Sequence, residues 1–96
     1  MATGIINKPF NDRFDVRSIA ANASYTYTLE SSAGYVLIIS GISARRGFYL
    51  AYCASAGTVS ETAMQTSSVI TIDNSVANKL KITASSAVVA TLIKVT

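Results

Sequence analysis

The chain has 96 residues, of which half are hydrophobic and 14% are charged, which is typical of one folded domain and excludes a disordered chain. Histidine is absent and Cys53 is the single cysteine, so His-based catalytic triads, His-ligated or thiolate metal sites and an intrachain disulfide are excluded. The net charge of +3 comes from scattered basic residues, and no apolar window reaches the roughly 18 residues of a membrane span. We therefore expect no metal, no cofactor, no nucleic-acid binding and no membrane insertion.

Residue types indicate strands rather than helices. Val, Ile, Thr, Tyr and Phe clearly outnumber Leu, Glu, Lys, Gln and Arg, and β-branched and aromatic side chains fit a pleated sheet better than a helix. Residues 1–12 have no sustained periodicity and contain the sole proline, Pro9. We interpret residues 1–12 as a leader or linker and residues 13–96 as a single domain.

The first half of this domain contains four predicted strands. Residues 13–19 and 24–30 alternate apolar with polar side chains, which is the period of a strand with one wet face. Residues 35–40 and 48–53 are apolar on both faces instead. Because one core hides only one face of a sheet, the strand at 35–40 is expected in the middle of a sandwich or at a subunit contact.

Two further strands follow in the middle of the chain. Residues 58–66 carry few large apolar side chains, and we interpret them as an edge strand or an irregular stretch. Residues 68–73 alternate, and the following Asp73-Asn74 pair predicts a turn, because short polar side chains hydrogen-bond to nearby backbone.

The last two predicted strands are residues 79–83, which alternate, and residues 87–95, which are apolar on both faces. A short Ser85-Ser86 turn separates them. We interpret the pair as a hairpin in which Leu80 and Ile82 face the core.

Seven or eight short strands separated by turn residues predict an all-β fold: a seven- to eight-stranded antiparallel β-sandwich, jelly-roll-like or Ig-like, with barrel closure left open. A sandwich of this length has too few strands to cover both faces of the strands that are apolar on both sides, so we expect an oligomer. Its predicted interface residues are Tyr35, Leu37, Ile39, Val89 and Ile93.

Five segments show a particular strand order, glycine placement and a terminal hairpin: Ser24-Tyr-Thr-Tyr-Thr-Leu29, Gly34-Tyr-Val-Leu-Ile-Ile39, Arg46-Gly-Phe-Tyr-Leu50, Asn78-Lys-Leu-Lys-Ile-Thr83 and Ala87-Val-Val-Ala-Thr-Leu-Ile93. In these features residues 14–95 resemble the small β-sandwich heads at the C-terminal ends of bacteriophage fibre and head-fibre proteins. The resemblance implies a homotrimeric distal knob, joined to a stalk by its leader and exposed on a virion, that contacts a host surface. It transfers no catalytic or binding residue.

The candidate ligand-binding residues are Arg45, Arg46 and Tyr49. The two arginines lie in a glycine-bounded loop, where their guanidinium groups suit an anionic glycan or a neighbouring subunit, although a solvated turn is the simpler interpretation. Tyr49 is the tyrosine expected at the surface, where its ring would stack on a sugar, whereas Tyr25 and Tyr27 fit a core or an interface. Cys53 is expected to be a small buried apolar group.

The acidic residues are isolated along the chain, at Asp12, Asp15, Glu30, Glu61 and Asp73. No pattern pairs a general acid with a base, so we predict that the protein is not an enzyme.

The function predicted first is a non-enzymatic structural and adhesion module of a virion. It is a trimeric, fibre-head-like domain on the particle surface that binds a host-cell glycan or protein, or other virion proteins. The alternative is a monomeric carbohydrate-binding or adhesin-like β-sandwich within a longer bacterial cell-surface protein. The first places the strands with two apolar faces in a subunit interface, and the second places them in a monomer core.

Overall fold

The computed structural model describes residues 14–41 and 45–96, without the side chain of Phe14, and these residues form eight strands. The predicted leader, residues 1–12, lies outside the described residues. The strands are β1 (Phe14–Ile19), β2 (Ala23–Thr28), β3 (Ala33–Ser40), β4 (Gly47–Cys53), β5 (Val59–Gln65), β6 (Ile70–Asp73), β7 (Lys79–Ala84) and β8 (Val88–Lys94). Each predicted strand overlaps one of them, including the weak segment 58–66, which is β5.

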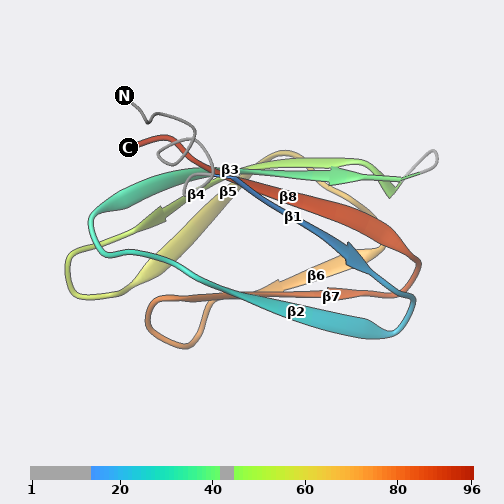
Figure 1. The fold of residues 1–96 in the computed structure, drawn as a ribbon, viewed down its shortest axis with the longest axis horizontal. Coiled ribbons are helices and arrows are strands. Elements are labelled where there is room, and N and C mark those ends of the chain that lie inside the picture. Colours follow the sequence, from blue (N-terminus) through green and yellow to red (C-terminus); the bar gives the residue numbers. More distant parts are fainter. Residues whose placement is uncertain (1–13, 42–44) are drawn as a thin grey trace, which may run out of the picture.

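The strands form two antiparallel sheets that pack face to face (Figure 1). The five-stranded sheet has the order β1-β8-β3-β4-β5, and the three-stranded sheet has the order β2-β7-β6. This confirms the prediction of an all-β antiparallel sandwich of seven to eight strands, of which the structure has eight. The first strand pairs with the last and the second with the seventh, so the chain folds back on itself in a jelly-roll-like way. β4 then pairs with β3, and β5 pairs with β4 at the edge of the sheet.

The hairpin predicted for the last two strands is wrong. β7 pairs with β2 and β6, whereas β8 pairs with β1 and β3 in the other sheet. The backbone N–H and the hydroxyl of Ser85 donate to the carbonyl of Val69, at 2.8 and 3.2 Å. These bonds hold the connection against the start of β6, so the chain crosses between the sheets at this point and does not reverse.

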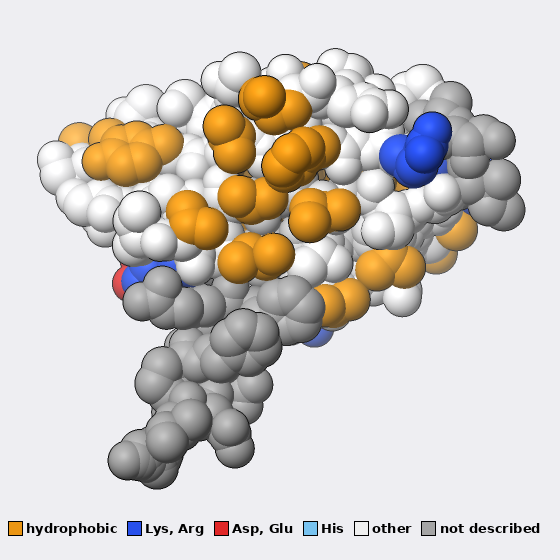
Figure 2. Space-filling model, turned by 90° about the horizontal axis from the view of Figure 1, so that it is seen from above, with side chains coloured by type: hydrophobic (Ala, Val, Ile, Leu, Met, Phe, Trp, Pro, Cys, Tyr) orange, Lys and Arg blue, Asp and Glu red, His pale blue; other side chains and the backbone are white. Residues whose placement is uncertain are grey.

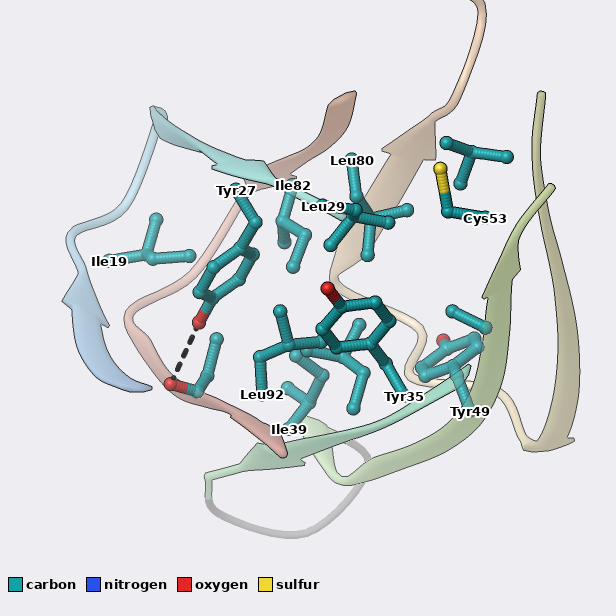
Figure 3. Close-up of a cluster of buried hydrophobic side chains, with 14 of the residues drawn as sticks. Ile19, Tyr27, Leu29, Tyr35, Ile39, Tyr49, Cys53, Leu80, Ile82 and Leu92 are labelled. Atoms are coloured by element: carbon teal, nitrogen blue, oxygen red, sulfur yellow. Dashed lines mark hydrogen bonds between the residues drawn. The ribbon is translucent and has the colours of Figure 1, made fainter. Parts of the chain in front are cut away.

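A single layer of side chains between the sheets forms the core (Figure 3). Burial alternates along β3 and β4, so every second residue of these strands points into this layer. Leu80 and Ile82 on β7 are fully buried, as predicted, and so is Cys53 at the end of β4. Because both sheets share one layer, each sheet keeps a second face outside the core.

Arg17 on β1 contacts Tyr25 on β2 where the edge strands of the two sheets lie next to each other. Its guanidinium carbon lies 4.7 Å from the centre of the Tyr25 ring and its Nε lies 3.0 Å from Asp15 Oδ1. Charged side chains on an edge strand also discourage pairing with another chain. The β1 edge is therefore poorly suited to adding a further strand.

Tyr27 joins the two sheets across the core. It belongs to β2, yet its hydroxyl donates to the carbonyl of Ala90 on β8 at 3.2 Å (Figure 3). Burial, and then the charge of Asp15, raise the pKa of Tyr27 above its ordinary value of 10.0. The neutral hydroxyl is therefore the form that the fold favours.

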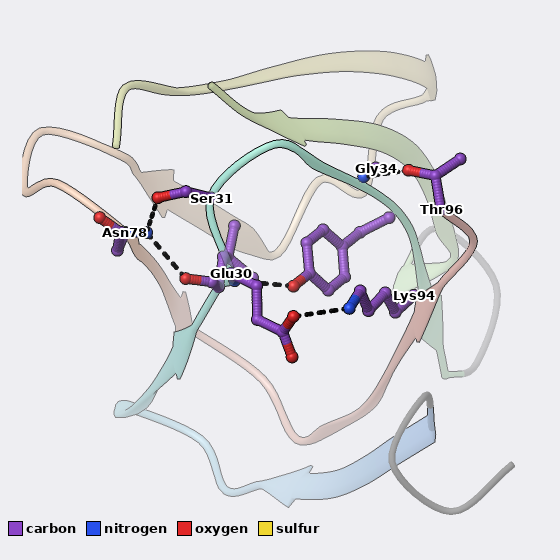
Figure 4. Close-up of polar contacts among 8 residues, drawn as sticks. Glu30, Ser31, Gly34, Asn78, Lys94 and Thr96 are labelled. Atoms are coloured by element: carbon purple, nitrogen blue, oxygen red, sulfur yellow. Dashed lines mark hydrogen bonds and ion pairs between the residues drawn. The ribbon is translucent and has the colours of Figure 1, made fainter. Parts of the chain in front are cut away.

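Asn78 joins three connections at one end of the sandwich (Figure 4). Its Nδ2 donates to the Leu29 carbonyl at 2.9 Å and to the Ser31 hydroxyl at 3.2 Å, and its backbone N–H donates to the Gly57 carbonyl at 2.9 Å. Asn78 has a φ of 60° and Gly57 a φ of 95°. A Cβ on Gly57 would lie 2.6 Å from Asn78 Oδ1, so this close approach requires glycine.

The Tyr27→Phe variant should lose about 1 kcal/mol of unfolding free energy at neutral pH, because the hydrogen bond between the sheets is removed. A raised pKa in the folded state means that this tyrosine ionises first in the unfolded chain. The stability that it contributes is therefore complete below pH 10.0 and falls as the pH rises further. Denaturant unfolding of both proteins between pH 7 and pH 11 should show the difference narrowing above pH 10; a constant difference would contradict this assignment.

The Asn78→Ala variant should lose roughly 1–3 kcal/mol, because the Leu29 carbonyl loses its donor and alanine is strained at positive φ. Asn22→Ala is the matched control, since Asn22 has a φ of 65° and no side-chain hydrogen bond within the described part of the chain. Denaturant unfolding should show the larger loss for Asn78→Ala. Equal losses would mean that backbone strain alone accounts for the effect.

Candidate functional site

The outer face of the three-stranded sheet is polar throughout. Ser24 Oγ lies 2.8 Å from Thr83 Oγ1, and Lys79 Nζ donates to the Thr28 hydroxyl at 2.8 Å. The outward residues of this sheet are Ser24, Thr26 and Thr28 on β2, Lys79, Lys81 and Thr83 on β7, and Thr71 and Asp73 on β6. This is the alternation expected of a sheet with one face in water.

The outer face of the five-stranded sheet is apolar instead, and Figure 2 shows hydrophobic side chains gathered across its centre. Five of these side chains are exposed: Val16 at 49%, Ile38 at 37%, Phe48 at 42%, Leu50 at 44% and Tyr52 at 48%. Val36, Val89 and Ile93 on the same face are half-buried. We call these eight residues the apolar face. None of the outward-facing strand residues described on this sheet is charged.

Strand register makes the apolar face continuous. Val36 on β3 lies opposite Leu50 on β4 and opposite Ile93 on β8. Ile38 lies opposite Phe48 on β4. The large side chains therefore concentrate on the three central strands, β8, β3 and β4, where directly opposed side chains are in contact range.

Three of the five predicted interface residues are wrong, because they face inward. Tyr35, Leu37 and Ile39 are 6%, 0% and 1% exposed and belong to the core. Val89 and Ile93, the other two, lie on the apolar face. An uninterrupted apolar run predicts burial on both sides of β3, but it does not tell which side meets the second sheet.

The prediction that Tyr49 lies at the surface is also wrong, since its side chain is 5% exposed. Its hydroxyl accepts the backbone N–H of Ser67 at 2.8 Å, and the Ser67 hydroxyl donates to the Arg45 carbonyl at 2.6 Å. A Cβ on Gly47 would lie 2.8 Å from the Tyr49 ring. Tyr49 thus fills a narrow part of the core and anchors the segment after β5.

A signal for the inward side of β4 was present in the sequence. Gly47, Ala51 and Cys53 are in phase with Tyr49, and glycine inside a strand often marks a close approach of other atoms. Small residues in phase therefore indicate the side on which the second sheet packs. This leaves Phe48, Leu50 and Tyr52 outside, and these are the binding candidates that the sequence prediction missed.

Arg45 lies at the end of the sandwich and is half-buried. Its Nη1 donates to the Ala87 carbonyl at 3.2 Å, which ties the segment before β4 to the start of β8. It lines a shallow groove of about 380 Å³ together with Ser40 and Val88, among others. Arg46 is exposed beside it. The structure thus separates the two arginines from Tyr49, whose ring is inside the core.

The described carboxylates are held apart by separate local partners. Asp15 pairs with Arg17, Glu30 with Lys94 at 2.6 Å (Figure 4), and Glu61 accepts from Asn74 Nδ2 at 2.5 Å. The hydroxyl and N–H of Ser75 donate to Asp73, at 2.6 and 2.9 Å, and hold the pKa of this carboxyl below its usual range. Across residues 14–41 and 45–96 no group of three potential metal-ligating side chains occurs.

A comparison of the chain with protein-family models, with curated proteins and with solved structures found no match. In the described ranges there is no helix with the length and hydropathy needed to cross a membrane.

The different environments of two tyrosines on β4 can be tested directly. Tyr49→Phe should cost roughly 1–3 kcal/mol, because the buried Ser67 N–H loses its acceptor. Tyr52→Phe removes an equivalent hydroxyl from an exposed side chain and should change stability by less than about 0.5 kcal/mol. Thermal and denaturant unfolding of the two variants should separate them; similar losses would contradict the inward placement of Tyr49.

Proposed function

We propose that the protein is a non-catalytic structural and adhesion module that assembles as a homotrimer, in the manner of the β-sandwich heads of bacteriophage fibres on a virion surface. The observation that carries this proposal is the apolar face. Contiguous apolar patches of this kind are uncommon on monomeric soluble proteins and mark interaction surfaces. Assembly therefore explains a surface that water does not favour.

The two outer faces of the sandwich support the proposal by contrast. Ser24, Thr26 and Lys81 are typical of the face of the three-stranded sheet, whereas Ile38, Phe48 and Leu50 occupy equivalent positions on the five-stranded sheet. Both sheets belong to one short chain and one core. The difference is consistent with one face in water and one face covered by protein.

A role without chemistry is supported by the polar groups. Each described carboxylate has its own local partner, and the lowered pKa of Asp73 is the opposite of what a general acid needs near neutral pH. The buried hydroxyls of Tyr27 and Tyr49 complete backbone hydrogen bonds of the fold. These groups serve the structure and do not converge on one reacting centre.

In such an assembly the ends of the sandwich remain free to contact a host-cell glycan or protein. The groove beside Arg45 lies at one of these ends, with Arg46 exposed next to it. Guanidinium groups suit carboxylate or phosphate groups of such a ligand. This end is the proposed adhesive surface.

A second candidate function is favoured by the aromatic side chains of the apolar face. Phe48 and Tyr52 lie on the same side of β4 and both are exposed. Aromatic rings of this kind present flat apolar surfaces to sugars. A monomeric carbohydrate-binding or adhesin-like module of a bacterial surface protein would use them in this way.

The homotrimer is tested by the molar mass of the protein in solution. Light scattering on a size-exclusion eluate should give three times the chain mass at every concentration in the micromolar range and above. A monomer would overturn the proposed assembly and favour the carbohydrate-binding module. A stable dimer would overturn the trimer as well.

A further inference from the structure

We propose that the apolar face of each chain is covered by the apolar faces of further copies of the same chain, forming a second core around the axis of the oligomer. This inference rests on the proposed function and names the surface and the partner that the assembly uses. It places Val36, Ile38 and Leu50 at the centre of the contact, with the outward residues of β5 at its margin.

Charge favours a second copy as the partner. The chain carries a net charge of +3, so two copies repel each other, and the repulsion is weakest when they meet on a surface that carries no charged side chain. The outward strand residues described on the five-stranded sheet include no charged side chain, whereas Lys79, Lys81 and Asp73 lie on the opposite sheet. A face with no charge attracts neither an acidic nor a basic partner, but it does permit identical basic chains to associate.

The side chains on the apolar face favour protein over sugar. Six of the eight residues are aliphatic: Val16, Val36, Ile38, Leu50, Val89 and Ile93. A sugar site needs aromatic rings combined with hydrogen-bonding groups, because a sugar is covered with hydroxyls. Aliphatic side chains offer no partner to these hydroxyls, but they pack well against the same side chains of another copy.

The size of the sheet fits a subunit contact. Five strands spaced by about 4.8 Å, each contributing about six residues of about 3.3 Å, give a planar area of roughly 500 Å². Side-chain relief raises the accessible area above this figure and towards the roughly 800 Å² per partner of a standard interface. The face is thus large enough for a specific contact, and in a trimer each subunit shares this area between two neighbours.

The width of the apolar region fits a threefold arrangement. The three central strands, β8, β3 and β4, span about 14 Å at the usual strand spacing. Three such faces arranged as a triangle place the axis about 4 Å from each sheet, close to half of the roughly 10 Å between packed sheets. The polar residues Ser60 and Thr62 on β5 then lie at the corners, where water enters.

The test compares Leu50→Asp with the matched control Thr26→Asp. Both positions are exposed strand residues, but Leu50 lies on the apolar face and Thr26 lies opposite Lys81 on the polar sheet. Circular dichroism establishes that both variants are folded, and light scattering gives their masses beside that of the unmodified protein. We expect Leu50→Asp to be a monomer and Thr26→Asp to keep the mass of the unmodified protein.

A cysteine variant keeps the inference testable if Leu50→Asp fails to fold. Ile38→Cys places a thiol at the centre of the apolar face. A disulfide needs two Cα atoms within about 7 Å, and the proposed packing brings residue 38 of neighbouring copies to about this distance. Mild oxidation should therefore cross-link two copies. Thr26→Cys is the control and should remain uncross-linked. Cys53 is buried and leaves the background low.

The outcomes separate this inference from the proposed function. A trimer that persists in Leu50→Asp, or an Ile38→Cys variant that does not cross-link, would overturn the proposed surface while leaving the trimer intact. A dimer that Leu50→Asp dissociates would support the surface and overturn the trimer. An unmodified protein that is a monomer at all concentrations would overturn both.

Discussion

The constraint on which this structure depends is that two sheets share a single layer of core side chains. Leu37, Ile39, Leu80 and Ile82 fill that layer and are 0–1% exposed. Burial of such side chains is the main favourable term in folding. Residues 14–41 and 45–96 contain no helix or strand beyond these two sheets, so neither outer face is covered by another described element. The residue types on each outer face then differ according to whether that face suits water or protein.

Few polar groups complete the sandwich, and each of those in the core satisfies the backbone. The Tyr27 hydroxyl crosses from one sheet to the other, Asn78 ties the connections at one end, and Ser67 links Tyr49 to the segment before β4. Buried polar groups without partners are costly. Asn78 and Tyr49 supply partners for backbone groups just beyond the strand ends, whereas the Tyr27 hydroxyl finds its own acceptor at Ala90, within β8. Their use within the fold, together with the separate pairing of the carboxylates, is why the proposed function depends on surfaces and on assembly.

The sequence predicts that a second apolar surface exists, but it does not predict which residues form it. The runs at residues 35–40 and 48–53 show from the sequence that two faces of these strands are apolar, and hence that an additional apolar surface exists. They do not show which face is inside, because a shift of one residue exchanges the two faces. Leu37 and Ile38 are neighbours of similar character, yet one is fully buried and the other is exposed.

The sequence by itself determined the class of fold. Alternation with a period of two, frequent β-branched residues and turn residues between short runs act locally, and they predicted seven or eight strands close to the observed bounds. Only the tertiary structure decided that β7 and β8 belong to different sheets, that Tyr49 is buried and Tyr52 exposed, and that the apolar face lies over β8, β3 and β4. These features depend on which side of each strand meets the second sheet, and that is settled by contacts between residues far apart in the chain.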